Sequence, residues 1–166
     1  MKHELTSEIE IRATPRQVWD VLVDLERWSE WNPFVTRSEG VAEVGSRLVN
    51  RMEAPGMRAM TIRPTVTEVA PGACFEWLGH LGVPGLFDGR HRFELQATDE
   101  GTRLVQREHF SGILVRLLRR SLDDNTRRGF EAMNEALRVR VEAAAPQDSP
   151  NVPGSAEAGR MGRATS

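Results

Sequence analysis

The sequence predicts an α+β domain in which an antiparallel sheet packs against one long C-terminal helix. Three observations lead to this prediction: an alternating start, several strand-like segments between short turns, and a helical apolar stripe near the end. The 166 residues, 39% of them hydrophobic and 28% charged, suffice for one domain with a sizeable core.

The chain opens with a predicted strand that is followed by two short helices. Over residues 3–12, apolar and charged side chains alternate, which is the period of a strand with one face in water. Thr14 and Pro15 then favour a helix start, because threonine caps a helix well and proline suits the first helical position. A second short helix is expected over residues 26–31, ending before Pro33.

Six further strands are expected before the long helix. The expected segments are 34–43, 47–53, 57–69, 74–80, 88–98 and 102–111. Most turns between them are short and contain glycine or proline, so the strands are expected to pair antiparallel, since a parallel crossover needs a dozen or more residues. Together with the first strand, they predict a seven-stranded curved antiparallel sheet.

The final element is predicted to be a long amphipathic helix. Its apolar stripe consists of Leu114, Val115, Leu118, Leu122, Thr126, Phe130, Met133, Leu137 and Val141. Such a stripe must be covered by the sheet. Residues 1–145 are therefore expected to form the domain. Residues 146–166, which are rich in proline and glycine and poor in bulky apolar groups, are expected to form a disordered tail.

Composition argues against several classes of function. The 22 basic and 24 acidic residues give a net charge of −2, so no nucleic-acid partner is expected. No apolar run approaches the roughly 20 residues of a transmembrane segment, and the polar start is unlike a signal peptide, so we expect a cytoplasmic protein. Cys74 is the single cysteine and the histidines lack metal-ligand spacing, so neither metal nor cofactor is expected. A monomer or a homodimer is expected.

Two parts of the sequence resemble a known superfamily. The stretch IEIRATPRQVWDVLVD at residues 9–24, continuing over residues 28–34, resembles the opening of START-like (SRPBCC) proteins, and in particular the polyketide cyclase/dehydrase and lipid-transport branch. Residues 101–104 and 108–112 resemble the last strand of that family. The resemblance covers residues 3–143. It implies a helix-grip fold, in which a curved sheet surrounds the long helix and leaves a mainly apolar cavity. The superfamily contains ligand carriers, cyclases, aromatases and regulators, so the resemblance does not specify a function.

His91 and Glu108 are the candidate catalytic residues. Alternation places each of them with apolar neighbours on one face of its strand, and the two strands are consecutive. A desolvated carboxylate beside an imidazole could act as a general acid/base pair near neutral pH. The alternative is a buried hydrogen-bonded pair that shapes the cavity wall without doing chemistry.

Further ligand-binding residues are expected on the same inner surface. They are Asn50, Met52, Met60, Ile62, Phe75, Trp77, Phe87, Phe93, Gln106, Phe130 and Met133. Methionine adapts to irregular shapes and Trp77 can stack on a planar group, so this set favours an apolar ligand. The segment 79–89, with its spaced glycines, is expected to form a mobile lip of the cavity. Core packing is the alternative for each side chain.

Three functions remain open at this point. The leading one is the binding of a hydrophobic small molecule, a lipid or polyketide-like compound, in a cavity between the sheet and the C-terminal helix. The second is a polyketide cyclase, aromatase or dehydratase in which His91 and Glu108 move protons. The third is a partner-binding module that uses the arginine-rich face of residues 116–128.

Overall fold

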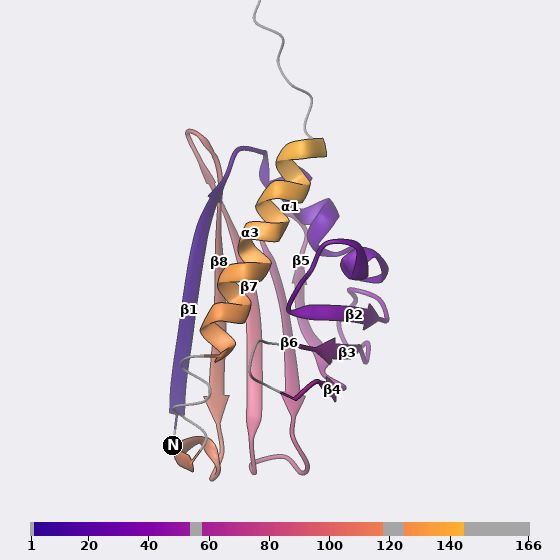
Figure 1. Cartoon of the computed structure of the whole chain (residues 1–166), viewed down its shortest axis with the longest axis vertical. Coiled ribbons are helices and arrows are strands. Elements are labelled where there is room, and N and C mark those ends of the chain that lie inside the picture. Colours follow the sequence, from indigo (N-terminus) through magenta and orange to yellow (C-terminus); the bar gives the residue numbers. More distant parts are fainter. Residues whose placement is uncertain (1, 54–57, 118–124, 145–166) are drawn as a thin grey trace, which may run out of the picture.

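A computed structural model of the whole chain describes residues 2–53, 58–117 and 125–144. Its main element is a five-stranded antiparallel sheet with the strand order β1-β8-β7-β6-β5 (Figure 1). The strands are β1 (Lys2–Ile11), β5 (Thr65–Ala70), β6 (Cys74–His80), β7 (Asp88–Thr98) and β8 (Gly101–Ser111). The long β7–β8 pair lies inside this sheet, flanked by β6 and β1.

A second, smaller sheet runs across the strands of the large one (Figure 1). It contains β2 (Val35–Glu39), β3 (Val49–Met52) and β4 (Met60–Ile62), in that order. The segment before β3 hydrogen-bonds to the start of β5. The Leu48 N–H donates to the Pro64 carbonyl at 2.8 Å, and the Gly45 N–H donates to the Val66 carbonyl at 2.9 Å. The small sheet is thereby anchored to one edge of the large sheet.

The prediction of one seven-stranded sheet is wrong in the number of strands and sheets. The expected strand 57–69 is two strands, because β4 ends at Ile62 and β5 begins at Thr65. Pro64 between them has no N–H and cannot continue a strand ladder, so the chain passes here from the small sheet to the large one. The α+β class and the antiparallel pairing are confirmed, and the arrangement fits a helix-grip fold.

Two short helices follow β1, as predicted. Helix α1 (Pro15–Leu22) begins with a capping box, in which the Thr14 hydroxyl accepts from the Gln17 N–H and the Gln17 side chain accepts from the Thr14 N–H. The second, η1 (Leu25–Glu30), is a 3₁₀ helix. Its Trp28 side chain is completely buried, and the indole N–H donates to the Leu22 carbonyl at 3.0 Å.

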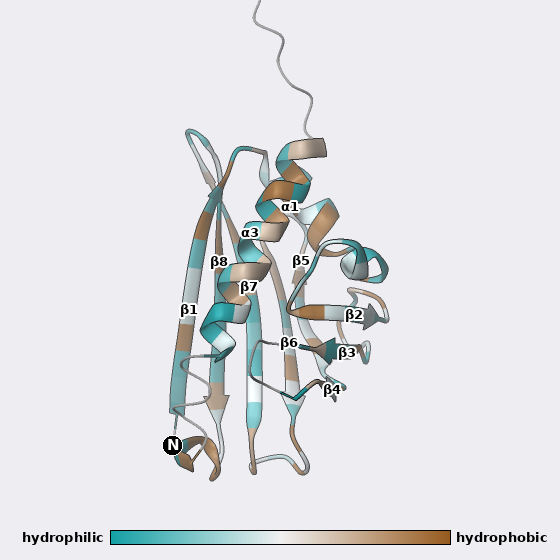
Figure 2. Cartoon of the chain, viewed as in Figure 1, coloured by the Kyte–Doolittle hydropathy of each residue, from teal (hydrophilic) through white to brown (hydrophobic). Residues whose placement is uncertain are grey.

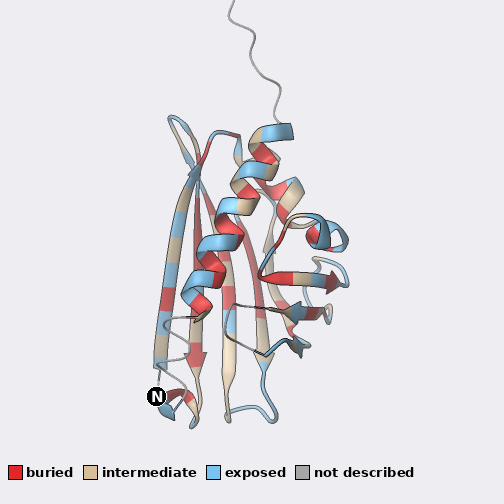
Figure 3. Cartoon of the chain, in the orientation of Figure 1, coloured by how far each residue is buried: buried red, intermediate tan, exposed pale blue. Residues whose placement is uncertain are grey.

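Helix α3 (Arg127–Ala144) lies across the inner face of the large sheet (Figure 1). Hydrophobic and hydrophilic bands alternate along it in Figure 2, and buried and exposed positions alternate along it in Figure 3. The buried apolar side chains include Phe130, Met133, Leu137 and Val141 from the predicted stripe. Residues 115–117 are also helical, whereas part of the predicted helix (118–124) and the predicted tail lie outside the described residues. None of the helices within the described ranges has the length and apolar character needed to cross a membrane.

The outer face of the large sheet carries a network of charged side chains. Glu76 is only 6% exposed and pairs with Arg90 at 2.5 Å and with Arg92 at 3.1 Å. Burial alone would raise the pKa of Glu76, but hydrogen bonds from Thr67, Arg90 and Arg92 together hold it below its ordinary value. This carboxylate is therefore stabilised in its charged form.

Candidate functional site

A cavity of about 110 Å³ lies between the two sheets, and α3 closes one side of it. The predicted residues on its wall are Asn50, Met52, Met60, Ile62, Trp77, Phe87, His91, Glu108 and Met133. The small sheet supplies much of this wall, whereas the predicted cavity lay between one sheet and the helix. The difference follows from the folding of β2–β4 into a sheet of their own opposite β6–β8.

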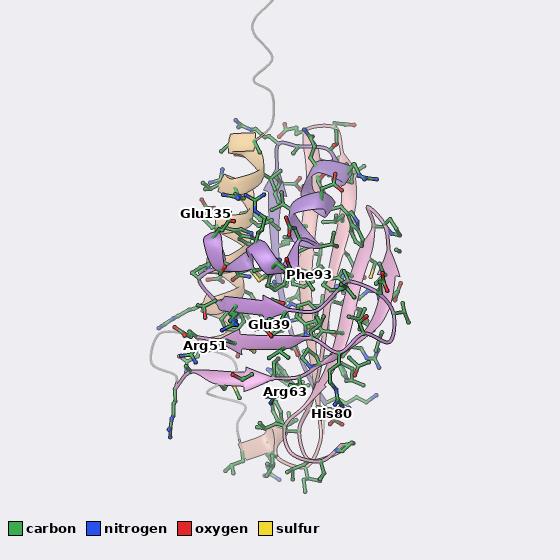
Figure 4. All side chains as sticks on the ribbon, turned by 90° about the vertical axis from the view of Figure 1, so that its right-hand side faces the viewer. Glu39, Arg51, Arg63, His80, Phe93 and Glu135 are labelled. Atoms are coloured by element: carbon green, nitrogen blue, oxygen red, sulfur yellow. The ribbon has the colours of Figure 1, made fainter. Side chains whose placement is uncertain are left out.

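Four residues predicted for the wall lie behind it instead. Phe75, Phe93, Gln106 and Phe130 are at most 1% exposed, and none of them lines the cavity. Trp28 packs edge-on against Phe93, with 6.4 Å between the ring centroids, and fills the space on that side. Figure 4 shows Phe93 well above His80, which lies near the lower end of the large sheet. A period of two specifies the face of a strand but not the position along it, so alternation could not separate these core residues from the wall.

Other wall residues did not appear among the predicted ligand contacts. They are Phe34, Val35, Arg58, Gly79, His80, Leu81, Gly89, Phe110 and Thr126. Several lie in the segment 79–89, which was expected to form the lip, and Thr126 belongs to the predicted helical stripe. The inner-face alternation of β8 was a usable signal for Phe110. No pattern in the sequence pointed to Arg58, which lies in a connecting segment.

His91 and Glu108 lie directly opposite each other on β7 and β8. The His91 Nδ1 contacts the Glu108 carboxylate oxygen Oε2, and the two side chains are only 4% and 11% exposed. Gly89, the next inward-facing residue of β7, makes room for this carboxylate, because a Cβ there would overlap Glu108 Oε1. Three residues thus form one local arrangement: a histidine, its carboxylate partner and the glycine beneath that carboxylate.

The His91 ring is held between aromatic side chains. It stacks on Trp77 with 4.7 Å between the centroids, and Phe130 meets it edge-on at 4.9 Å. Its second nitrogen, Nε2, is buried and has no hydrogen-bond partner among the described residues. When Nδ1 donates to the ionised Glu108, the neutral ring carries its lone pair on Nε2. His91 then offers a hydrogen-bond acceptor in an apolar environment.

Asn50 supplies a complementary group from the small sheet. It is completely buried on β3, and the Ser38 hydroxyl donates to its Oδ1 at 2.8 Å. Its Nδ2 has no partner within the described part of the chain. An unsatisfied buried donor costs about 1–3 kcal/mol, and a ligand acceptor that reaches it would recover part of that cost. Among the described residues, the cavity wall therefore carries an unpaired hydrogen-bond donor, the Asn50 Nδ2, and across from it an unpaired acceptor, the His91 Nε2.

A second histidine holds the lip of the cavity. The His80 Nδ1 lies 2.6 Å from the Asp88 Oδ1, and the Gly85 N–H donates to the other Asp88 oxygen at 2.9 Å. The hydrogen bond from His80 is the main reason why the pKa of Asp88 lies below its ordinary value. This pair ties the two ends of the turn between β6 and β7 together.

Neither metal nor thiol chemistry is indicated by the described residues. No three His, Cys, Asp or Glu side chains in the described ranges are placed to hold a metal ion. Cys74 lies on the outer face of the large sheet, and burial raises the pKa of its thiol to about 12. A thiol with such a pKa is a poor nucleophile near neutral pH.

The sequence matches one family model, and the fold matches solved structures. The model for polyketide cyclase/dehydrase and lipid transport proteins matches residues 2–145. The Zhui aromatase/cyclase from a Streptomyces species is 17% identical, with a TM-score of 0.67 over 86% of this chain and 94% of that chain. The di-domain aromatase/cyclase StfQ of the steffimycin biosynthetic pathway is 15% identical, with a TM-score of 0.72 over 86% of this chain and 52% of that one.

A third similar structure comes from Thermus thermophilus. It is 23% identical, with a TM-score of 0.70 over 86% of this chain and 99% of that chain. No curated protein sequence matches the chain. At these identities, the structural likeness shows a shared fold. The family match and the aromatase/cyclase neighbours support a role in hydrophobic ligand binding or polyketide cyclisation, without separating the two.

Proposed function

Because the chain belongs to the polyketide cyclase/dehydrase and lipid transport family, we propose that its cavity binds a hydrophobic small molecule, a lipid or a polyketide-like compound. The observation that carries this proposal is the contrast between an apolar wall and two buried polar groups with free capacity. Ligand sites in proteins combine mostly apolar linings with a few polar groups that orient the ligand. Here those groups are the side chains of His91 and Asn50.

The same two groups suggest how a ligand is oriented. A hydroxyl group on the ligand can donate to the His91 Nε2, and a carbonyl oxygen can accept from the Asn50 Nδ2. Met52, Met60 and Ile62 then contact the apolar body of the ligand from the small sheet. The proposed ligand is therefore an apolar molecule with one or two oxygen functions.

Filling the cavity tests this proposal. Ile62→Trp adds bulk to the wall and is expected to abolish or strongly weaken binding of a fluorescent apolar probe, 1-anilinonaphthalene sulfonate. Val139→Trp is the control, because Val139 is 55% exposed on α3 and does not line the cavity. Equal probe binding by both variants, with circular dichroism spectra like that of the wild type, would place the probe outside the cavity and refute the proposal.

The second candidate function is enzymatic, and the His91–Glu108 pair favours it. In a cyclisation or dehydration, the Nε2 lone pair would accept a proton from a substrate carbon beside a carbonyl group, and Glu108 would stabilise the resulting imidazolium. Asn50 would donate to the carbonyl oxygen that gains negative charge. Both functions use the same cavity, and they differ only in whether a proton moves.

Two substitutions separate binding from catalysis. His91→Gln keeps a polar side chain of similar volume but cannot accept a proton near neutral pH, so turnover should stop while ligand affinity changes little. Glu108→Gln keeps the shape of the side chain and removes its charge. It should lower turnover, because the imidazolium formed on His91 would lose the carboxylate that stabilises it. If the wild-type protein binds a ligand and never converts it, the result supports the binding function and contradicts the enzymatic one.

The arginine-rich helix face has less support as a partner site. Of the arginines in residues 116–128, the structure describes Arg116, Arg127 and Arg128, and Arg127 donates to the Thr6 carbonyl at 3.3 Å. Much of the remaining arginine-rich segment, residues 118–124, lies outside the described residues.

A further inference from the structure

Large apolar side chains are exposed at the end of the molecule where the cavity lip lies. They are Leu81 and Val83 in the turn between β6 and β7, and Ile113 and Leu117 after β8, with exposures of 41%, 65%, 77% and 80%. We call these four residues the apolar end. Each of them would be more stable away from water, and nothing within the described residues covers them.

The two segments of the apolar end are joined to each other. The Ile113 N–H donates to the Gly85 carbonyl at 3.3 Å, and the Leu114 N–H donates to the Leu86 carbonyl at 3.1 Å. Both segments lie at the lower end of the molecule in Figure 1, at the far end of its longest axis from the end of α3. They form neighbouring tips at an extremity of the molecule.

The apolar end is also continuous with the cavity. Leu81 belongs both to this exposed group and to the cavity wall, and its neighbour His80 lines the cavity as well. The Leu81 N–H donates to the carbonyl of Phe87, which is another wall residue. Whatever covers the apolar end therefore sits beside the cavity lip.

Two cations lie at the same end of the molecule. Lys2 at the start of β1 lies opposite Ser111, and Arg116 lies within the second tip. Neither of them forms an ion pair with another described residue. Asp88 and Glu4 also lie near this end, where Asp88 is hydrogen-bonded to His80 and Glu4 lies 3.8 Å from His109. Lys2 and Arg116 are exposed and can therefore contact an anionic surface.

We propose that the apolar end docks onto an anionic lipid bilayer, with the two tips in the interfacial region and the cations at the lipid headgroups. Aliphatic side chains beside free cations are the combination that binds such interfaces. The four side chains lie on two tips at an extremity of the molecule, a shape that suits insertion into a bilayer interface. Docking in this orientation would bring the cavity lip to the membrane surface. This interaction surface goes beyond the proposed ligand-binding function.

Flotation of the full chain with lipid vesicles tests the docking surface. The probe is vesicles of phosphatidylcholine with phosphatidylglycerol, beside vesicles of phosphatidylcholine alone. Val83→Asp with Ile113→Asp should reduce binding to the anionic vesicles by about tenfold or more. Val41→Asp with Val44→Asp is the matched control. It makes the same change in net charge at residues that are 55% and 66% exposed in the connection between β2 and β3. This control should retain binding.

Three outcomes would overturn the proposal. The first is that the wild-type protein does not float with anionic vesicles. This outcome includes the case in which an acidic carrier protein binds the apolar end instead. The second is equal loss in the control, which would mean that net charge alone decides. The third is equal binding to uncharged vesicles. The cavity variant Ile62→Trp should float like the wild type, so a failed ligand proposal and a failed docking proposal give different results.

Discussion

Replacing Gly129 with alanine should destabilise the protein, although alanine is the better helix residue. Gly129 is buried on α3, and a Cβ at this position would lie 2.5 Å from Cε2 and 2.8 Å from Cγ of the Phe34 ring. These distances are far below ordinary carbon–carbon contact. The ring is only 3% exposed and meets Phe130 edge-on at 5.7 Å, so the direction in which it can move is toward the cavity that it lines.

Two opposing effects determine the magnitude. Alanine gains at most about 1 kcal/mol over glycine in a helix, because glycine loses more backbone entropy on folding. Overpacking a well-packed core costs about 1–3 kcal/mol, and displacing a buried ring belongs at the upper end of that range. The expected net loss in the free energy of unfolding is therefore about 1–2 kcal/mol.

Urea unfolding followed by tryptophan fluorescence measures this difference. Glu131→Ala, at an exposed position of the same helix, is the control for helix propensity alone. Phe34→Leu in the Gly129→Ala background should recover part of the loss by making room for the new methyl group. If Gly129→Ala is as stable as the wild type or more stable, the close approach of Phe34 to α3 is wrong.

Three further predictions concern separate features of the molecule. Gly89→Ala should displace the Glu108 carboxylate from His91, visible as a changed ring-nitrogen NMR signal; an unchanged signal would contradict the packing described above. Native Cys74 should resist iodoacetamide at about pH 8 and react after unfolding, because its pKa is raised to about 12; rapid alkylation of the folded protein would contradict this. Glu76→Gln should destabilise the protein by about 1–3 kcal/mol at pH 7. The folded-state pKa of Glu76 is lowered, so its contribution is present above the ordinary value of 4.5 and is lost as the pH falls through the folded value. The melting temperatures of variant and wild type should then converge in acid; a constant difference would exclude the charge as the cause.

The facing of His91 and Glu108 could be predicted because a short connection determines the register of β7 and β8. Thr98 pairs with Gly101, so only Asp99 and Glu100 lie in the turn, and each step away from it brings the next pair into register. Tight turns of this kind constrain strand pairing strongly. The inward face of each strand then followed from alternation.

The division into two sheets could not be read from the same patterns. Residues 57–69 look like one strand because alternation continues on both sides of Pro64, and periodicity carries no information about which sheet a strand joins. The separation of wall from core failed for a related reason. Phe75 and Trp77 share a face, but only Trp77 reaches the cavity, and that depends on packing by segments distant in sequence.

The anchoring of the small sheet at one edge has a consequence for how this cavity can diversify. Asn50, Met52, Met60 and Ile62 contribute to the wall from β3 and β4, outside the large sheet. Substitutions at these positions alter the size and polarity of the cavity while the β1-β8-β7-β6-β5 ladder keeps its pairing. Ligand preference can therefore change through substitutions at a few positions on one wall, while the large sheet stays unchanged. Selection experiments aimed at new ligands should begin with β3 and β4.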